Sequence, residues 1–130
     1  MKTRYKVLII VAAVIVIIVV GFSILFNSLN KTLEGLVNIE IIEPKLTEIP
    51  NGVYRGTYSA FPVKVVVDVE IQNARITKVK IVEHQQGMGL PAEVLADEIV
   101  SRQQVNLDSV AGATYSSRVI LLAVQDALTL

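Results

Sequence analysis

The residues best suited to chemistry lie near the C-terminus, in the segment Asp108-Ser109-Val110-Ala111-Gly112-Ala113-Thr114-Tyr115-Ser116-Ser117. Gly112 and Ala113 have small side chains that allow a tight backbone turn, and the hydroxyl of Thr114 follows them. Apolar residues at helical spacing run from Val119 to Leu128, so we expect Thr114 at or just before the N-cap of a final helix. A helix start offers unpaired N–H groups and the positive end of the helix dipole, which favour a phosphate group. The segment therefore indicates either a phosphate-binding turn or an ordinary Thr cap.

The pattern Asp-x-x-x-Gly-Ala-Thr, followed by Tyr-Ser-Ser, resembles the FMN-binding domain family. This family includes membrane-anchored subunits of bacterial Rnf-type and sodium-translocating NADH:quinone oxidoreductase complexes. In those proteins the last Thr of the motif carries FMN through a phosphoester bond, which a flavin transferase installs with FAD as the FMN donor. The resemblance implies covalent FMN on Thr114, with Asp108, Gly112 and Ala113 completing the transferase recognition sequence. Ala111 departs from the family, which usually has Ser or Thr there, and so removes a hydroxyl near the phosphate.

The residues that follow Thr114 are further candidates for the site. Tyr115 can cover the flavin or seal the start of the final helix, and we favour the seal. Ser116 and Ser117 belong to the first helical turn, where the hydroxyl of Ser117 can reach the phosphate. Arg118 can pair with the phosphate charge or remain a solvated helix charge, and we favour the solvated charge.

A second loop of interest is Glu83-His84-Gln85-Gln86-Gly87-Met88-Gly89-Leu90. Gly87 and Gly89 let the backbone approach a flat ring, and Met88 supplies a soft apolar contact. His84 can hydrogen-bond the polar edge of a flavin or a redox partner. The resemblance implies that this loop borders the isoalloxazine ring, and the alternative is a flexible glycine loop with a solvent-exposed His84.

Other kinds of site find little support in the sequence. His84 is the only histidine and cysteine is absent, which excludes multi-histidine and thiolate metal centres, so we expect no metal site. A single His at no informative spacing does not indicate a Ser–His–Asp arrangement, and we assign no catalytic residue. Glu93, Asp97 and Glu98 resemble a carboxylate cluster, but acidic residues in the first half of a helix are more often surface residues favoured by the dipole.

Residues 7–26 form a run of twenty uncharged residues dominated by Val and Ile. At about 1.5 Å per residue this run is long enough to cross a bilayer core of about 30 Å. A cleavable signal peptide is the alternative, but its apolar region usually has about 7–15 residues and ends in small side chains. Here the run ends in Phe22-Ser23-Ile24-Leu25-Phe26, so we expect a retained single transmembrane helix in the lipid bilayer.

The distribution of charge predicts the orientation of this helix. Lys2, Arg4 and Lys6 precede the run, and only Lys31 follows it closely. The positive-inside rule therefore puts residues 1–6 in the cytoplasm and the rest of the chain on the extracytoplasmic face. The chain has twelve basic and twelve acidic residues, so the part after the run carries nine against twelve, a net charge of −3. We expect no nucleic-acid partner for this part.

Alternating patterns predict three antiparallel strands. The first is expected at Gly52–Tyr58, the second around the shared face of Val63, Val65, Val67, Val69 and Ile71, and the third at Ile76–Glu83 with Val79 and Ile81 inward. The turn between the last two is expected at Gln72–Arg75, because Asn73 tolerates the left-handed conformation.

Two helices are expected to cover this sheet. The first begins near Pro91 with an apolar stripe of Val94, Leu95 and Ile99, to which Val100 can also belong, and the second is the final helix. We therefore predict an α+β fold, a small antiparallel sheet with helices packed on one face, preceded by a single N-terminal transmembrane helix.

The expected organisation is residues 1–6 in the cytoplasm, an anchor at 7–26, a tether at 27–35 and an extracytoplasmic FMN-binding domain at 36–130. Weak strand periodicity from Leu36 indicates a segment that packs along the domain edge. The expected function is a membrane-anchored flavoprotein that transfers electrons to or from a membrane or exported redox partner. The alternative is an exported partner-binding domain of the same fold with non-covalent or lost flavin, which the substitution at Ala111 favours.

Overall fold

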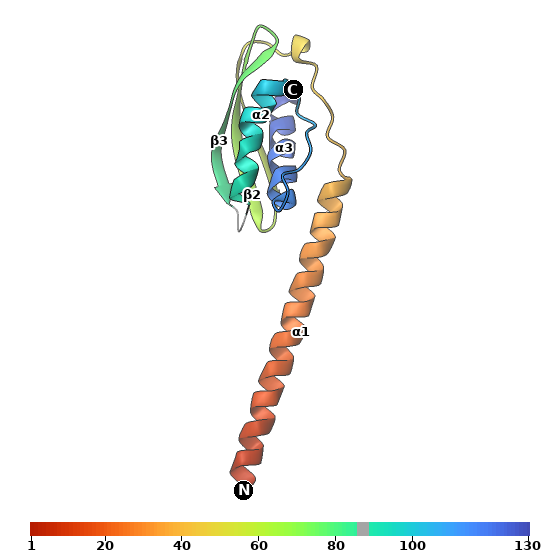
Figure 1. Cartoon of the computed structure of the whole chain (residues 1–130), viewed down its shortest axis with the longest axis vertical. Coiled ribbons are helices and arrows are strands. Elements are labelled where there is room, and N and C mark those ends of the chain that lie inside the picture. The colour runs from red at the N-terminus through yellow and green to blue at the C-terminus, as the bar shows by residue number, and fades with distance from the viewer. Residues whose placement is uncertain (86–88) are drawn as a thin grey trace. The chain divides into compact units, whose positions relative to one another are not determined.

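The computed structural model describes residues 1–85 and 89–130 (Figure 1). Its contacts divide the chain into two units, Met1–Glu34 and Gly35–Leu130, which are described separately. Apart from Met1, the first unit lies within α1 (Lys2–Asn38), a helix of 37 residues. The most apolar window of α1 has a mean hydropathy of 3.4, and none of it is buried. By length and composition, α1 can therefore cross a membrane.

Helix α1 extends well beyond the predicted anchor. It includes the expected tether and ends only at Asn38. The strand periodicity expected from Leu36 is wrong, because Leu36 lies in the last turns of α1 and the residues that follow form no strand. The alternation covers only a few residues, and the chain has no proline before Pro44 that would end the helix earlier.

The second unit contains a three-stranded antiparallel sheet in the order β1-β2-β3. Its strands are β1 (Gly52–Ala60), β2 (Val63–Gln72) and β3 (Arg75–Gln85). The inward residues predicted for β2 are all buried, namely Val63, Val65, Val67, Val69 and Ile71. Asn73 and Ala74 form the β2–β3 turn with φ angles of 50° and 59°, the left-handed conformation that a tight hairpin requires.

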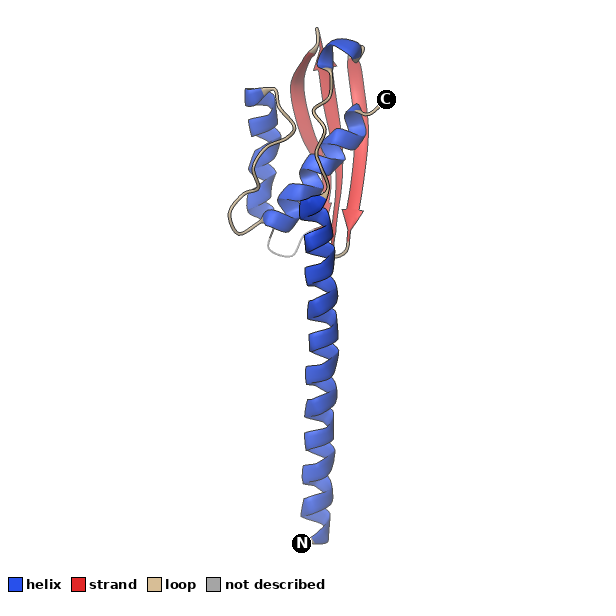
Figure 2. Cartoon of the chain, turned by 90° about the vertical axis from the view of Figure 1, so that its right-hand side faces the viewer, coloured by secondary structure: helices blue, strands red, loops and turns tan. Residues whose placement is uncertain are grey.

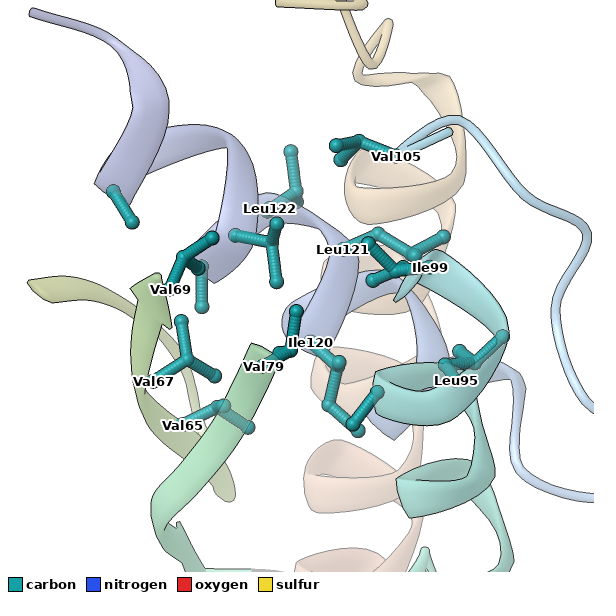
Figure 3. Packing of buried hydrophobic residues seen from close by; sticks show 14 of the residues in the cluster. Val65, Val67, Val69, Val79, Leu95, Ile99, Val105, Ile120, Leu121 and Leu122 are labelled. Atoms are coloured by element: carbon teal, nitrogen blue, oxygen red, sulfur yellow. The ribbon is translucent and has the colours of Figure 1, made fainter. Parts of the chain in front are cut away.

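Two helices cover one face of the sheet (Figure 2). Helix α3 (Thr114–Leu128) packs on β1 and β2, and α2 (Val94–Arg102) packs on β3. Their apolar side chains meet those of the sheet in one core, which Figure 3 shows with Val65, Val67, Val69, Val79, Leu95, Ile99, Ile120 and Leu121. Gly56 lets α3 approach β1 closely, because a Cβ there would lie 2.0 Å from the Ala123 carbonyl oxygen. The chain therefore has the predicted α+β fold.

The other face of the sheet carries charged side chains. The Arg55 guanidinium on β1 donates two hydrogen bonds of 2.7 and 2.9 Å to the Asp68 carboxylate on β2. These hydrogen bonds hold the pKa of Asp68 below its usual value. Lys78 and Lys80 of β3 are exposed, as their outward positions in the sequence predict.

Helix α2 buries Leu95 and Ile99 of its predicted apolar stripe, but not Val94. Val94 was expected in its apolar stripe but is 48% exposed, whereas Ala96 is buried with Leu95 and Ile99. The helix follows a 3₁₀ turn, η2 (Leu90–Glu93). Because a 3₁₀ turn has about 3.0 residues per turn instead of 3.6, it changes the phase with which the helix meets the sheet.

The segment between α1 and β1 contacts α3 and the loop between α2 and α3. Leu36, near the end of α1, is buried in the core together with Ile41 and Ile49 of this segment, and a 3₁₀ turn, η1, spans Leu46–Glu48. The Ile42 N–H donates to the Gln125 side chain of α3 at 2.8 Å. The Glu43 carboxylate accepts the Val105 N–H at 2.9 Å, in the loop between α2 and α3. This segment is therefore an integral part of the second unit.

Candidate functional site

The Gly-Ala-Thr motif forms a tight turn that leads directly into α3. Gly112 has a φ of +77°, a conformation that glycine adopts without strain. The Ala113 N–H donates to the Val110 carbonyl at 3.0 Å and closes the turn. Ala113 is buried, while Ala111 and Gly112 are exposed. Gly112 and Ala113 therefore allow the backbone to make the tight turn that their small side chains predict.

Thr114 is the first residue of α3 and is exposed. The expected position at or just before the N-cap is wrong, because Ala113 occupies the N-cap and no side chain caps the helix. The turn between α2 and α3 ends at Ala113, so α3 begins at Thr114, earlier than the sequence predicts. The Thr114 hydroxyl makes no hydrogen bond within the described part of the chain. The hydroxyl is thus available for chemistry, because it does not cap the backbone N–H groups at the start of α3.

Ser117 has a structural position. Its hydroxyl donates to the Ala113 carbonyl at 2.6 Å and accepts the Val110 N–H at 2.9 Å. The side chain is fully buried. The Ser117 hydroxyl therefore holds the turn to the helix, and its proton is already donated within the protein.

Tyr115 fastens the helix start to a distant part of the sheet. Its hydroxyl donates to the carbonyl of Phe61, in the turn between β1 and β2. The ring is half-buried against the core. This contact agrees with the interpretation of Tyr115 as a seal on the start of α3.

His84 lies inside the protein, and the alternative of a solvent-exposed His is wrong. Its side chain is 2% exposed. Nδ1 lies 2.9 Å from Glu93 Oε1 in η2, and Nε2 lies 3.1 Å from Ser116 Oγ in α3. Three segments far apart in sequence therefore meet at His84. The spacing of the three residues gave no sign of this Ser–His–Glu chain, because it exists only after the strand and both helices have packed.

Arg118 has neither of its expected roles. Its guanidinium donates to the Leu36 carbonyl at 3.2 Å and to the Ile39 carbonyl. Both acceptors belong to the last turn of α1 or the residue after it. Arg118 thus satisfies carbonyl groups at a helix end, where a positive charge is favourable.

Of the three loop residues predicted to border the flavin, the structure describes Gly89. Gly87 and Met88 lie outside the described residues. Gly89 is buried and directly precedes η2, with an ordinary φ of −92°. Asp108 is exposed before the turn.

The structure brings the motif and the end of β3 to one end of the sheet. The β1–β2 turn is linked to Tyr115, and the last residues of β3 are linked to Ser116. Among the described residues, a groove of about 390 Å³ lies elsewhere, against Gln125 and Leu128 near the C-terminal end of α3. That end lies about 20 Å along the helix from Thr114, at about 1.5 Å per residue. We therefore place the candidate site at the start of α3.

The described residues contain no group of three or more His, Cys, Asp or Glu side chains that could hold a metal ion. Of the three acidic residues considered in the sequence, Asp97 is exposed, Glu98 is half-buried and Glu93 contacts His84.

Comparison with known proteins gives the family. A family model described as "FMN-binding domain" matches residues 58–129, from the end of β1 through α3. No curated protein matches the chain. The family match covers more than half of the sequence, so the chain belongs to the FMN-binding domain family and its cofactor is FMN.

Proposed function

We propose that this FMN-binding protein carries its cofactor covalently, through a phosphoester bond to Thr114, and transfers electrons at the extracytoplasmic face of a membrane. The cofactor follows from the family, and the apolar helix α1 fits a membrane-anchored protein.

The exposure of the hydroxyl groups in the motif carries the proposal. Thr114 is exposed and its hydroxyl has no hydrogen-bond partner among the described residues. Ser116 and Ser117 are buried with their hydroxyls engaged, and the Tyr115 hydroxyl donates to Phe61. An enzyme that approaches from solvent would therefore meet the Thr114 hydroxyl first.

The attachment step is a phosphoryl-centre substitution. The Thr114 oxygen forms a bond to the phosphorus of the FMN half of FAD, and the bond from that phosphorus to the AMP oxygen breaks. AMP leaves and the Thr114 proton passes to solvent or to a base of the transferase. Nothing is oxidised or reduced, and the protein gains one FMN less one water.

The start of α3 suits a phosphodiester, which keeps one negative charge. A helix N-terminus favours a negative charge by roughly 0.3–1 kcal/mol at an exposed position. The first turn of α3 contains no acidic residue. Gly112 exposes its backbone, because no atom lies within 4 Å of the position that a Cβ would occupy. Asp108, Gly112 and Ala113 would serve recognition by the flavin transferase.

When bound, FMN supplies the redox chemistry, and the protein supplies attachment and surroundings. The loop of Gly87, Met88 and Gly89 would border the flavin ring. Covalent attachment prevents loss of the cofactor by dilution, since it replaces a bimolecular equilibrium with a permanently high local concentration. This property suits a protein that works outside the cell, with a membrane or exported redox partner.

The orientation of α1 follows from its flanking charges. Lys2, Arg4 and Lys6 precede the apolar run, which favours a cytoplasmic N-terminus and a retained anchor. The flavin transferase of this family works on exported substrates, so an extracytoplasmic Thr114 is required for attachment.

Coexpression of the full chain with a flavin transferase and FAD tests the attachment. Intact mass should rise by one FMN less one water, and peptide mapping should place the flavin on Thr114. The matched control is expression without the transferase, which should give the unmodified mass. Flavin at another residue, or no flavin on the wild type, contradicts the proposal.

Protease treatment of spheroplasts tests the orientation separately. The domain that follows α1 should be digested without lysis of the cell, because it faces outward. A protected domain contradicts an extracytoplasmic site. Replacing Lys2, Arg4 and Lys6 by Gln and adding Lys after Phe26 should weaken or invert insertion and lower flavin attachment in cells.

A further inference from the structure

His84 links three elements that meet at the candidate site. On β3 it pairs with Val65 of β2, whose side chain is fully buried. It contacts Glu93 in η2 and Ser116 in the first turn of α3. Other inward residues of β3, Ile76 and Val79, are apolar. A polar ring at such a position costs free energy unless its nitrogens are satisfied, and both are satisfied here.

The hydrogen-bond partners of His84 indicate which of its ring nitrogens carries a proton. An ionised Glu93 carboxylate only accepts hydrogen bonds, so His84 Nδ1 carries a proton and donates it. In the neutral ring, Nε2 then accepts the Ser116 hydroxyl. Glu93 thereby fixes the ring orientation in which His84 can hold Ser116.

The Ser116–His84–Glu93 chain does not have the exposure of a nucleophilic triad. Ser116 is 2% exposed and lies in the first turn of α3, on the buried side of the helix. Residues two apart on a helix point in nearly opposite directions, which is why Thr114 is exposed and Ser116 is buried. The bond to His84 on the buried side therefore fixes which way Thr114 faces on the exposed side.

We propose that His84 is a positioning residue for the modification of Thr114. Through Ser116 it holds the first turn of α3 against β3, so that the Thr114 hydroxyl is presented to the flavin transferase in one orientation. The inference rests on the proposed attachment at Thr114. A hydrogen bond shielded from water resists fraying more than an exposed one, and helix ends are among the first parts of a protein to open.

Two substitutions of His84 separate its two contacts. In His84→Gln the longer amide reaches the place of Nε2 and can still bind Ser116. In His84→Asn the amide nitrogen takes the place of Nδ1, so the link to Glu93 remains and the link to Ser116 is lost. Ser116→Ala removes the same link from the other side.

The rate at which purified transferase and FAD modify the full chain is the first measurement. We expect Ser116→Ala and His84→Asn to slow modification by about tenfold each, the effect of losing one buried hydrogen bond of about 1.4 kcal/mol. Combining them should give little further loss, because both break the same contact. His84→Gln should remain within about threefold of the wild type.

Gln103→Ala is the matched control for lost stability. The Gln103 side chain makes hydrogen bonds to Ile76, at the opposite end of β3 from His84, and to Val100 of α2. Its removal should lower the unfolding temperature without changing the modification rate. If Gln103→Ala slows modification as much as Ser116→Ala, the effect is general destabilisation and the positioning role is wrong.

Amide hydrogen exchange of the unmodified protein provides a test that needs no flavin. The Ser117 N–H bonds the Ala113 carbonyl at 2.9 Å and reports on the first turn of α3. It should exchange about tenfold faster in His84→Asn than in the wild type, and close to the wild-type rate in His84→Gln. Unchanged exchange in His84→Asn overturns the inference. An unmodified wild type with the expected exchange pattern would overturn only the proposed attachment.

Discussion

The starts of α2 and α3 lie on the two sides of His84, yet only one of them suits a phosphate. Helix α2 is entered through η2, with Glu93 directly before it and Asp97 in its first turn. Helix α3 is entered through Gly112 and Ala113 and has no acidic residue in its first turn. The carboxylates near the start of α2 place negative charge where the helix dipole would otherwise favour a phosphate. A helix N-terminus is therefore not sufficient for a phosphate site, which also needs freedom from competing anions.

The two starts also differ in their exposed groups. Val94, at the beginning of α2, is an exposed apolar residue, whereas Thr114, at the beginning of α3, is an exposed hydroxyl. Buried contacts hold the turn around Thr114 through Ser116 and Ser117. The combination of a fixed turn and a free hydroxyl distinguishes α3.

Removal of the Thr114 hydroxyl should have the largest effect on flavin attachment at the start of α3. Thr114→Val should abolish covalent flavin, because the hydroxyls of Ser116 and Ser117, which follow in the first turn of α3, are buried. Since Thr114 does not cap α3, the cost in unfolding free energy should fall below the roughly 1 kcal/mol of a lost cap. Intact mass and thermal unfolding measure the two effects. Thr114→Ser is the matched control and should retain attachment; flavin on Thr114→Val would remove the distinction between the two helix starts.

Much of the fold was predictable from periodicity. The alternation in β2 and the helical spacing in α3 mark residues that are buried in the structure, among them Val67 and Ile120. The positions of Val94 and Leu36 were not predicted correctly. A 3₁₀ turn changes the phase at Val94, and the alternation after Leu36 is too short to identify a strand.

The site was predictable only where it is local in sequence. The turn of Gly112, Ala113 and Thr114 follows from consecutive residues. The contact of His84 with Glu93 and Ser116 joins residues 9 and 32 positions apart, and it depends on how β3, η2 and α3 pack. No spacing rule encodes such a contact. A register shift between Ile81 and Glu83 also turns His84 inward, whereas simple alternation from Val79 and Ile81 predicts Glu83 on that face.

Distortion of the turn should have the next largest effect. Gly112→Ala forces an alanine to a φ of +77°, at a cost of about 1–2 kcal/mol, although its Cβ would meet no neighbour. We expect modification of Thr114 to slow by about tenfold as the turn relaxes. Gly35→Ala is the matched control, because Gly35 also has open space but lies in a helix, where alanine is favourable. In Gly35→Ala the unfolding temperature and the modification rate should therefore rise slightly or stay unchanged, whereas both should fall in Gly112→Ala. An equal fall of the modification rate in both variants contradicts the argument from φ.

A carboxylate placed beside α3 should make its start resemble that of α2. Ala111 is exposed in the turn, so Ala111→Asp adds a charge near the phosphate without filling the core. We expect modification to slow by about two- to fivefold, the equivalent of roughly 0.3–1 kcal/mol. Added salt should reduce the difference by screening. Ala111→Asn has nearly the same shape without the charge, and if it slows modification equally, electrostatics is not the reason for the contrast between the helices.

The smallest effect is expected where the chain departs from its family. Family members usually have Ser or Thr at the position of Ala111, and this residue is exposed beside Gly112. A hydroxyl restored by Ala111→Ser can donate one hydrogen bond to the phosphate, and at an exposed position this bond should contribute about 0.5 kcal/mol, the weak end of its usual range. The modification rate should then rise by about twofold, with no change in unfolding temperature. Ala111→Val tests the same position with a side chain that cannot donate. A rise of a hundredfold in Ala111→Ser would instead mean that the missing hydroxyl, and not the exposure of Thr114, governs attachment in this chain.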